Sequence, residues 1–421
     1  MAGAPWRAMD GPVSPDAPLA PRGARSLHLT LVTETYPPEI NGVAMTVARL
    51  TEGLRRRGHR VQLIRPRQGA AKEARPACTP EEVLTRGLPI PGYDRLRMGL
   101  PAGGRLRRLW RTQRPDLVHI VTEGPLGWSA LNAARALGLP VTSSFHTNFH
   151  AYSRHYGLGW LATPIAAYLR AFHNRADLTL VPTTALQTGL AALGFKRLEV
   201  LARGVDTGLF TPTRRSAALR ASWHAGPDTP VVLYVGRLAP EKNLALLFAA
   251  YGALRARRPD ARLVLVGDGP LRETLARTHP EAVFAGPRTG EDLATHYASG
   301  DIFLFPSLTE TFGNVTLEAM ASGLAVVAFD YAAAHELIQH GENGLLAPFA
   351  SAEDFCAAAL VLTDPGQLRA LGAAARRRAA AFDWALIHDR FEALLYQVLD
   401  PRHRRHHAAP YSLGSRAAGR L

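Results

Sequence analysis

Two successive series of short apolar runs alternate with helix-type patterns along this chain of 421 residues. Short, wholly apolar runs predict parallel strands that are buried on both faces. Their alternation with helices predicts doubly wound parallel sheets. The strands are expected at 27–33, 61–64, 117–121, 141–145, 178–181 and 199–201, and then at 231–235, 263–266, 283–285, 302–305, 325–329 and 345–347. The fold class is therefore α/β, with two Rossmann-like domains facing a central cleft in which the carboxyl ends of strands meet ligands.

The two series also predict how the chain divides. A length of 421 residues is enough for two domains, each with its own core. The N-terminal residues are rich in Pro, Ala and Gly without an apolar core, so they are not a secretory signal. The expected segments are a disordered N-terminal segment at 1–25, a first domain at 26–206, a linker at 207–229, a second domain at 230–383, a helix at 384–400 and a basic flexible tail at 401–421.

Composition restricts the environment and the partners of the chain. The net charge of +14 indicates an acidic partner, which can be a nucleic acid, a nucleotide substrate or an anionic membrane. Cys78 and Cys356 match no metal-binding spacing, which favours a reduced, cytoplasmic setting. No apolar run approaches the ~20 residues that are needed to span a bilayer.

The segment 301–323 predicts a strand, a loop and the start of a helix. The helix is expected to begin at Asn314, so that the backbone N–H groups of Asn314, Val315 and Thr316 are free at its positive end. Such an end suits a phosphate or pyrophosphate. Glu310 and Glu318 flank it, and a carboxylate can accept hydrogen bonds from two neighbouring hydroxyls. Either glutamate alone is more commonly structural, but the pair around an anion site matches the outline of a nucleotide sugar.

Four further residues lie at three places where a predicted strand gives way to a loop or a helix. Arg237 and Lys242 follow the first strand of the second domain and can converge on one pyrophosphate, although basic residues are ordinary in such loops. Gly42 opens the first helix, where a glycine allows the backbone to approach a phosphate closely. The simpler interpretation is a tight turn. His146 ends a first-domain strand and should point into the cleft, although a lone histidine is usually just a hydrogen-bonded polar residue.

Together these motifs resemble those of retaining GT-B glycosyltransferases of the large family 4 type. The resemblance covers about residues 27–399 and is nearest to bacterial GDP-mannose-dependent α-mannosyltransferases and sulfoquinovosyl-type lipid transferases. It is carried by the Glu-x7-Glu spacing, the Gly236–Lys242 loop, the Pro37-Pro38-x3-Gly42 loop and the segments Phe145–Asn148, Phe172–Arg175 and Arg203–Asp206. One departure is the loop 331–335, which has alanines where many relatives carry glycines.

The resemblance implies roles for these residues. Arg237 and Lys242 hold the donor phosphates and Glu318 holds the ribose. Glu310 holds sugar hydroxyls, and His146 lies near the anomeric centre. The loop that contains Gly42 touches the donor from across the cleft, and the last helix crosses back onto the first domain. Retention then proceeds through an oxocarbenium-like transition state without a dedicated nucleophile. The sequence has no Asp-x-Asp pair, so neither a metal nor any other cofactor beside the donor is expected.

The expected function is transfer of a hexose, mannose from GDP-mannose, to a hydroxyl of a lipid or glycan. The alternative is a UDP-sugar donor carrying glucose or sulfoquinovose, since no motif identifies the base, and a GT-B phosphorylase or epimerase comes third. A nucleic-acid-binding protein is a different class, but it predicts aromatic residues among the arginines, and the basic stretch has only Trp110. The absence of Gly-x-Gly-x-x-Gly after either first strand disfavours a nicotinamide enzyme.

The arginine-rich stretch 95–111 allows two interpretations. Its arginines alternate with Leu96, Met98, Leu106, Leu109 and Trp110, so the stretch could lie on an anionic membrane. It could equally be one solvated helix face. With a lipid acceptor, the first interpretation places a cytoplasmic protein peripherally on the inner face of the plasma membrane.

Overall fold

The computed structural model describes residues 25–37, 39, 41–67, 81–90, 93–146, 162–310 and 312–401. Apart from Arg25 and Pro401, the predicted disordered N-terminal segment and the predicted basic tail lie outside these residues.

The first domain contains a seven-stranded sheet in the order β3-β2-β1-β6-β7-β8-β9, with every pairing parallel. Its strands are β1 (His28–Val32), β2 (Arg60–Pro66), β3 (Glu82–Thr85), β6 (Leu117–Ile120), β7 (Val141–Ser144), β8 (Leu178–Val181) and β9 (Leu198–Val200). Its helices are α1 (Gly42–Arg56), α2 (Gly103–Thr112), α3 (Pro125–Ala136), α5 (Ala162–His173) and α6 (Thr184–Ala192). An antiparallel hairpin, β4 (Gly87–Ile90) and β5 (Tyr93–Gly99), precedes α2.

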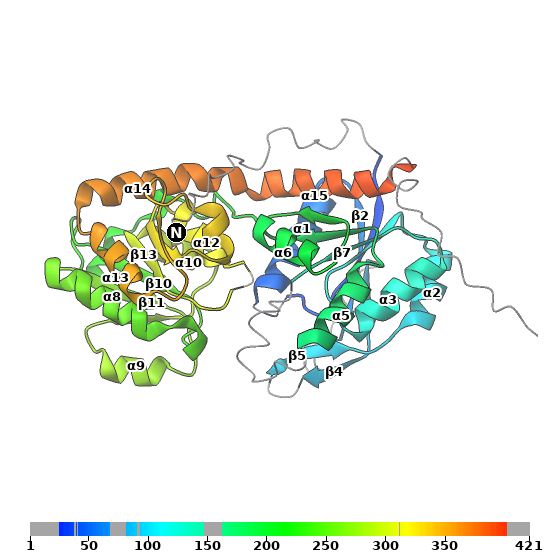
Figure 1. Ribbon diagram of the computed structural model, residues 1–421, viewed down its shortest axis with the longest axis horizontal. Helices are drawn as coiled ribbons and strands as arrows, with labels where there is room; N and C mark the ends of the chain where they lie inside the picture. The colour runs from blue at the N-terminus through cyan, green and yellow to red at the C-terminus, as the bar shows by residue number, and fades with distance from the viewer. Residues whose placement is uncertain are drawn as a thin grey trace, which may run out of the picture.

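The second domain contains a six-stranded parallel sheet in the order β12-β11-β10-β13-β14-β15. Its strands are β10 (Val231–Val235), β11 (Arg262–Val266), β12 (Val283–Gly286), β13 (Ile302–Phe305), β14 (Ala325–Phe329) and β15 (Leu345–Ala347). Its helices are α8 (Leu244–Arg257), α9 (Arg272–Thr278), α10 (Gly290–Ala298), α11 (Asn314–Ala321), α12 (Ala332–Leu337), α13 (Ala352–Val361) and α14 (Pro365–Ala379). The two parallel sheets confirm the predicted α/β class and its two Rossmann-like units (Figure 1).

The basic stretch 95–111 is not one helix face. Its first part lies in β5 and its second part in α2, two elements that the sequence analysis did not separate. Leu106 and Trp110 of α2 are fully buried, in a core cluster that includes residues of α3. Residues four apart lie on the same face of a helix, so both side chains face the core. The two apolar residues therefore cannot insert into a membrane, while the arginines of α2 are exposed.

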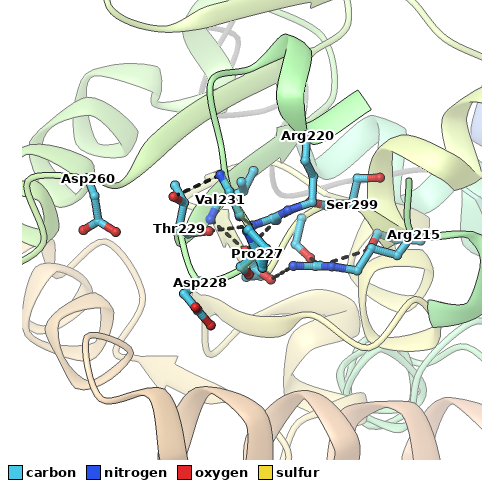
Figure 2. Close-up of polar contacts among 12 residues, drawn as sticks. Arg215, Arg220, Pro227, Asp228, Thr229, Val231, Asp260 and Ser299 are labelled. Atoms are coloured by element: carbon cyan, nitrogen blue, oxygen red, sulfur yellow. Dashed lines mark hydrogen bonds and ion pairs between the residues drawn. The ribbon is translucent and has the colours of Figure 1, made fainter. Parts of the chain in front are cut away.

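The segment 207–229, predicted as a linker, packs on the second domain. It contains a 3-10 turn and the short helix α7 (Ala217–Ser222), and it places Phe210 and Trp223 in that domain's core. Arg220 fixes it, because its guanidinium donates to the carbonyls of Thr229 (2.7 Å), Ser299 (2.9 Å) and two further residues, Gly226 and Pro227 (Figure 2). The same group forms a 3.0 Å ion pair with Asp301. These polar contacts fold the segment into the body of the domain.

The last helix, α15 (Trp384–Leu399), leaves the second domain and packs on the first. Ile387, Phe391 and Leu394 join the core cluster of the first domain, and α15 contacts α1. At its edge, His59 lies 2.9 Å from Glu392. Figure 1 shows α14 and α15 running along one side of both domains, in orange and red. The chain therefore crosses between the domains twice.

We expect Arg220→Gln to lower the free energy of unfolding by about 3 kcal/mol, because it leaves buried carbonyl groups without their donor. It also removes the more buried of the two arginines that pair with Asp301, the other being Arg215 at 2.7 Å. Urea unfolding followed by circular dichroism measures this change. Arg272→Gln is the matched control, since Arg272 is 41% exposed and lies 3.9 Å from Asp268, and its loss should cost less than about 0.5 kcal/mol. Equal effects of the two variants would show that Arg220 does not anchor the segment.

Candidate active site

The helix α11 begins at the carboxyl edge of the second sheet, after β13. Gly313 precedes it with φ 96°, a left-handed conformation that favours glycine. The N–H of Thr316 donates to the carbonyl of Gly313 at 3.1 Å, so this amide, which was predicted to be free for a phosphate, is used inside the first turn. The amides of Asn314 and Val315 belong to the first turn, where the helix itself supplies no acceptor. The anion site at this end therefore has two helix amides, rather than the three predicted.

Glu310 lies in the loop before α11 and contacts Lys242 directly. The ammonium group of Lys242 forms an ion pair with Oε1 of Glu310, which also accepts a 2.9 Å hydrogen bond from Ser307. The hydroxyl of Tyr331 donates to the Glu310 carbonyl at 3.0 Å. The sequence analysis assigned Lys242 to phosphate and Glu310 to sugar hydroxyls, and the structure brings the two together. A ligand at this point would meet a fixed carboxylate and a fixed cation side by side.

Arg237 lies on the same βα loop as Lys242 but extends toward solvent. Its side chain is 61% exposed, and its guanidinium lies 3.5 Å from Glu241. Lys242, by contrast, is 16% exposed and turned inward. Of the two predicted phosphate-binding cations, only Lys242 is thus held in position by buried contacts.

Glu318 lies one turn into α11, and the residue as a whole is partly buried. Its Oε2 accepts a 2.9 Å hydrogen bond from the hydroxyl of Tyr297, a fully buried residue of α10. Burial raises the pKa of Glu318 to about 7, although the bond from Tyr297 acts in the opposite direction. Near neutral pH this group can therefore both accept and donate hydrogen bonds, which suits the neighbouring hydroxyls of a ribose.

Gly42 opens α1 in the first domain and lies where the two domains meet. A Cβ at this position would stand 3.1 Å from Nη1 of Arg203 and 3.9 Å from Nδ2 of Asn314. Asn41 caps the helix, because its Oδ1 accepts from the N–H groups of Val43 (3.1 Å) and Ala44 (2.8 Å). A side chain at Gly42 would therefore crowd the Arg203 guanidinium, and the amides that follow Gly42 are already engaged.

His146 follows β7 in the first domain. Its Nδ1 lies 3.5 Å from Nη2 of Arg203. A guanidinium can only donate, so Nδ1 is the acceptor and the proton of the neutral ring sits on Nε2. Burial, with a further contribution from the charge of Arg203, lowers the pKa of His146 well below 6.5. His146 is therefore a neutral hydrogen-bond donor, rather than an imidazolium acid, at physiological pH.

The sequence analysis quoted Arg203 within a motif but gave it no role. This side chain is 5% exposed, donates to the carbonyl of Gly42 at 3.4 Å, and lies 5.8 Å from the centre of the Phe312 ring in the other domain. It follows a predicted strand of the first domain, at the edge where His146 also lies. Position at a strand end was thus the one signal that could have found it.

A second histidine, His119, contacts the strand that precedes His146, and the sequence analysis did not single it out. His119 is buried, with Nδ1 2.8 Å from the hydroxyl of Thr142 and Nε2 3.0 Å from that of Ser144. Burial lowers its pKa to about 3, so the ring is neutral and supports the strand that carries His146.

The loop before Glu336 also borders the site. Ala332 has φ 52°, the left-handed region in which an alanine is strained. The following amide, of Ala333, donates to the carbonyl of Phe312 at 2.8 Å. This bond ties α12 to the loop of Glu310 and holds the strained residue in place. Ala332 thus adopts a left-handed backbone conformation that normally favours glycine, although the residue at this position is an alanine.

The raised pKa of Glu318 predicts a pH dependence of stability. Between about pH 4.5 and pH 7 the folded chain binds a proton there that the unfolded chain releases, so this group's contribution to stability is lost as pH rises. Glu318→Gln should therefore gain stability relative to the wild type, on the order of 2 kcal/mol more at pH 7.5 than at pH 5. Urea midpoints at the two pH values measure the difference. Glu291→Gln, at a 78% exposed site, is the control, and an identical pH response of the wild type and Glu318→Gln would contradict the assignment.

Known proteins match this chain across both domains. Residues 40–209 match the family model described as "Glycosyltransferase Family 4", and residues 229–364 match that described as "Glycosyl transferases group 1". A GDP-mannose-dependent alpha-mannosyltransferase of Mycobacterium tuberculosis is 38% identical, over 86% of this chain and 94% of the relative. The sulfoquinovosyl transferase SQD2 of Arabidopsis thaliana is 35% identical, over 79% of this chain and 66% of the relative.

Solved structures agree on the fold. A sucrose-phosphate synthase from Thermosynechococcus elongatus superposes with a TM-score of 0.70 at 22% identity, covering 88% of this chain and 98% of its own. Anabaena HepE in complex with UDP superposes with a TM-score of 0.71 at 21% identity, covering 88% and 100%. The solved structures show the fold alone, whereas the family models and the 38% identical relative also show the family. The chain belongs to the GT-B glycosyltransferases of family 4, and it is a glycosyltransferase.

Proposed function

We propose that this enzyme transfers mannose from GDP-mannose to a hydroxyl of a lipid or glycan acceptor, with retention of the anomeric configuration and without a metal ion. The observation that carries this proposal is that the start of α11, which follows the loop of the Lys242–Glu310 ion pair, lies against Gly42 and Arg203 of the other domain. Arg203 in turn contacts His146. The donor is chosen because the relatives at 35–38% identity include GDP-mannose-dependent alpha-mannosyltransferases.

In the proposed reaction, the bond between the sugar C1 and the β-phosphate oxygen breaks as a bond from C1 to the acceptor oxygen forms on the same face. The acceptor's proton passes to the departing phosphate oxygen, so the products are a glycoside and a nucleoside diphosphate. Lys242, Arg237 and the two first-turn amides of α11 stabilise the negative charge that grows on the diphosphate. Stabilising that charge is the main catalytic contribution of the protein.

The remaining site residues orient the donor. Glu310, held by Lys242 and Ser307, accepts hydrogen bonds from sugar hydroxyls. Glu318 binds the ribose, and His146 donates from Nε2 to a group near the anomeric carbon. Metal independence is proposed because cationic side chains and helix amides occupy the place of a chelated cation, and the sequence has no Asp-x-Asp pair.

A UDP-sugar is the second candidate donor. The 35% identity to a protein named as a sulfoquinovosyl transferase favours this alternative, in which glucose or sulfoquinovose is transferred to a lipid. The base therefore has to be identified by experiment.

Thermal unfolding with GDP, UDP and ADP tests the donor directly. A ligand at 100 times its Kd stabilises the folded state by ~2.7 kcal/mol, so GDP should raise the melting temperature most. A larger shift with UDP would favour the alternative donor, and no shift with any nucleotide would refute the function. Transfer in EDTA, with the anomeric coupling of the product read by NMR, tests metal independence and retention in one reaction.

Two glutamate variants in the same panel separate the proposed roles. Glu318→Ala should weaken nucleotide binding about tenfold or more, whereas Glu310→Ala should leave the nucleotide bound and depress turnover. The reverse pattern would contradict the roles assigned to these carboxylates. Glu291→Ala, at an exposed position, should change neither measurement.

We further propose that the enzyme is cytoplasmic and docks on the inner face of an anionic membrane through the first domain. Within the part of the chain that the structure describes, no helix combines the length and apolar content that crossing a bilayer requires. The hairpin β4–β5 exposes the register partners Leu88 (50%) and Met98 (38%). The helix that follows, α2, exposes Arg107 and Arg108. Exposed apolar side chains and exposed arginines on the same domain suit an anionic lipid surface.

Vesicle co-sedimentation tests this docking. The wild type should bind vesicles that contain phosphatidylglycerol and release them as salt rises, and the double variant Arg107→Glu/Arg108→Glu should bind at least about tenfold more weakly. The matched control is Arg255→Glu/Arg257→Glu, because these two arginines are exposed on α8 of the other domain. Equal binding to neutral and anionic vesicles would remove the proposal.

A further inference from the structure

Arg203 is a buried cation whose hydrogen bonds are incomplete. Its side chain is 5% exposed, yet its donors reach only the carbonyl of Gly42 at 3.4 Å and Nδ1 of His146 at 3.5 Å. Its Nε is buried and has no hydrogen-bond partner. Hydrogen bonds from a charged donor are normally about 2.7–2.9 Å long. The guanidinium therefore has unused capacity to donate.

The buried Arg220 of the second domain shows what a structural arginine looks like in this chain. Arg220 is 3% exposed, and its contacts include three carbonyls within 3.0 Å and an ion pair with Asp301. Among the residues that the structure describes, no carboxylate forms an ion pair with Arg203. Burial lowers the pKa of Arg203 to about 10, which still leaves it charged at neutral pH. A buried charge without a counter-ion is costly unless an anion joins it.

The position of Arg203 indicates where an anion that joins it would be bound. Its Nη1 and the side-chain amide of Asn314, the first residue of α11, both lie within 4 Å of the same point beside Gly42. Its guanidinium also lies over the ring of Phe312, just before that helix. Arg203 thus faces the start of α11 from the opposite domain. An anion bound by the α11 amides would lie between the two.

The other charged side chains near the start of α11 supply little net positive charge for a bound diphosphate. Lys242 and Glu310 form an ion pair, so together they contribute no net charge to the site. Arg237 is 61% exposed and therefore screened by solvent. Of these three cations, Arg203 is the one that is buried and forms no ion pair with a carboxylate, although the charge of Glu310 acts on it from beyond ion-pair distance. A diphosphate at this point would therefore gain charge compensation from the first domain as well as from the second.

We propose that Arg203 binds the β-phosphate of the nucleoside diphosphate leaving group, so that cations from both domains hold the diphosphate as the sugar departs. This inference rests on the proposed function, since it requires a nucleotide-sugar donor. It adds a residue of the first domain to a phosphate site otherwise built from the second. It also accounts for a glycine at position 42, because a Cβ there would lie 3.1 Å from Nη1 and crowd the guanidinium.

The test compares nucleotides with and without the β-phosphate. Isothermal titration of the full chain with GDP and GMP, and in parallel with UDP and UMP, gives the affinity contributed by that phosphate. Arg203→Gln should weaken binding of the diphosphate by about tenfold or more and change monophosphate binding less than about twofold. Arg203→Lys, which keeps the charge but loses the fork of donors, should fall between the wild type and Arg203→Gln.

Controls separate this role from a structural one. Arg390→Gln removes a first-domain arginine that already pairs with Glu199 at 3.1 Å, and it should leave both affinities unchanged. Melting temperatures without nucleotide show whether each variant is folded. Equal losses of diphosphate and monophosphate binding in Arg203→Gln, or no loss of either, would overturn the proposal. If the wild type itself bound neither GDP nor UDP, the proposed function would fail instead, and this inference with it.

Discussion

The site depends on the place where the chain passes between the domains for the second time. The N–H of Val205 donates to the carbonyl of Phe382 at 2.9 Å, and the N–H of Trp384 donates back to the carbonyl of Val205 at 3.1 Å. The ring of Trp384 packs so closely on Gly204 that a Cβ there would stand 2.7 Å from it. Because Arg203 immediately precedes this bridge, the crossing that joins the domains also fixes the cation at their junction.

Burial favours the neutral form of each site group, but the charge that remains at neutral pH differs because their ordinary pKa values differ. It raises the pKa of Glu318 to about 7 and lowers that of His146 well below 6.5, so each moves toward its neutral form. It lowers the pKa of Arg203 as well, but only to about 10. The same desolvation therefore leaves a histidine that donates a hydrogen bond, a carboxyl group that can share a proton, and an arginine that keeps its charge.

The sequence predicted the layers of the fold better than the contacts of the site. Buried strands such as 302–305 are recognisable because they lie in apolar runs, and all the predicted strands are present. The β4–β5 hairpin was missed because its arginines and glycines resemble a loop. The segment 207–229 appeared to be a linker because Arg220, which anchors it, is a charged residue with long-range partners. The sequence analysis placed Lys242 and Glu310 each after a strand of the second domain, but only the structure shows that they bind each other.

The direct pairing of Lys242 with Glu310 bears on how charge can be used in catalysis. A lysine that is already matched by a carboxylate has less attraction left for a ground-state diphosphate, whose charge is spread over several oxygens. Charge that concentrates on the leaving oxygen during bond cleavage would compete better for the same ammonium. A cation without a carboxylate partner, such as Arg203, attracts the diphosphate in both states. In the proposed reaction, Arg203 would therefore contribute mainly to binding of the donor, and Lys242 mainly to stabilising the transition state.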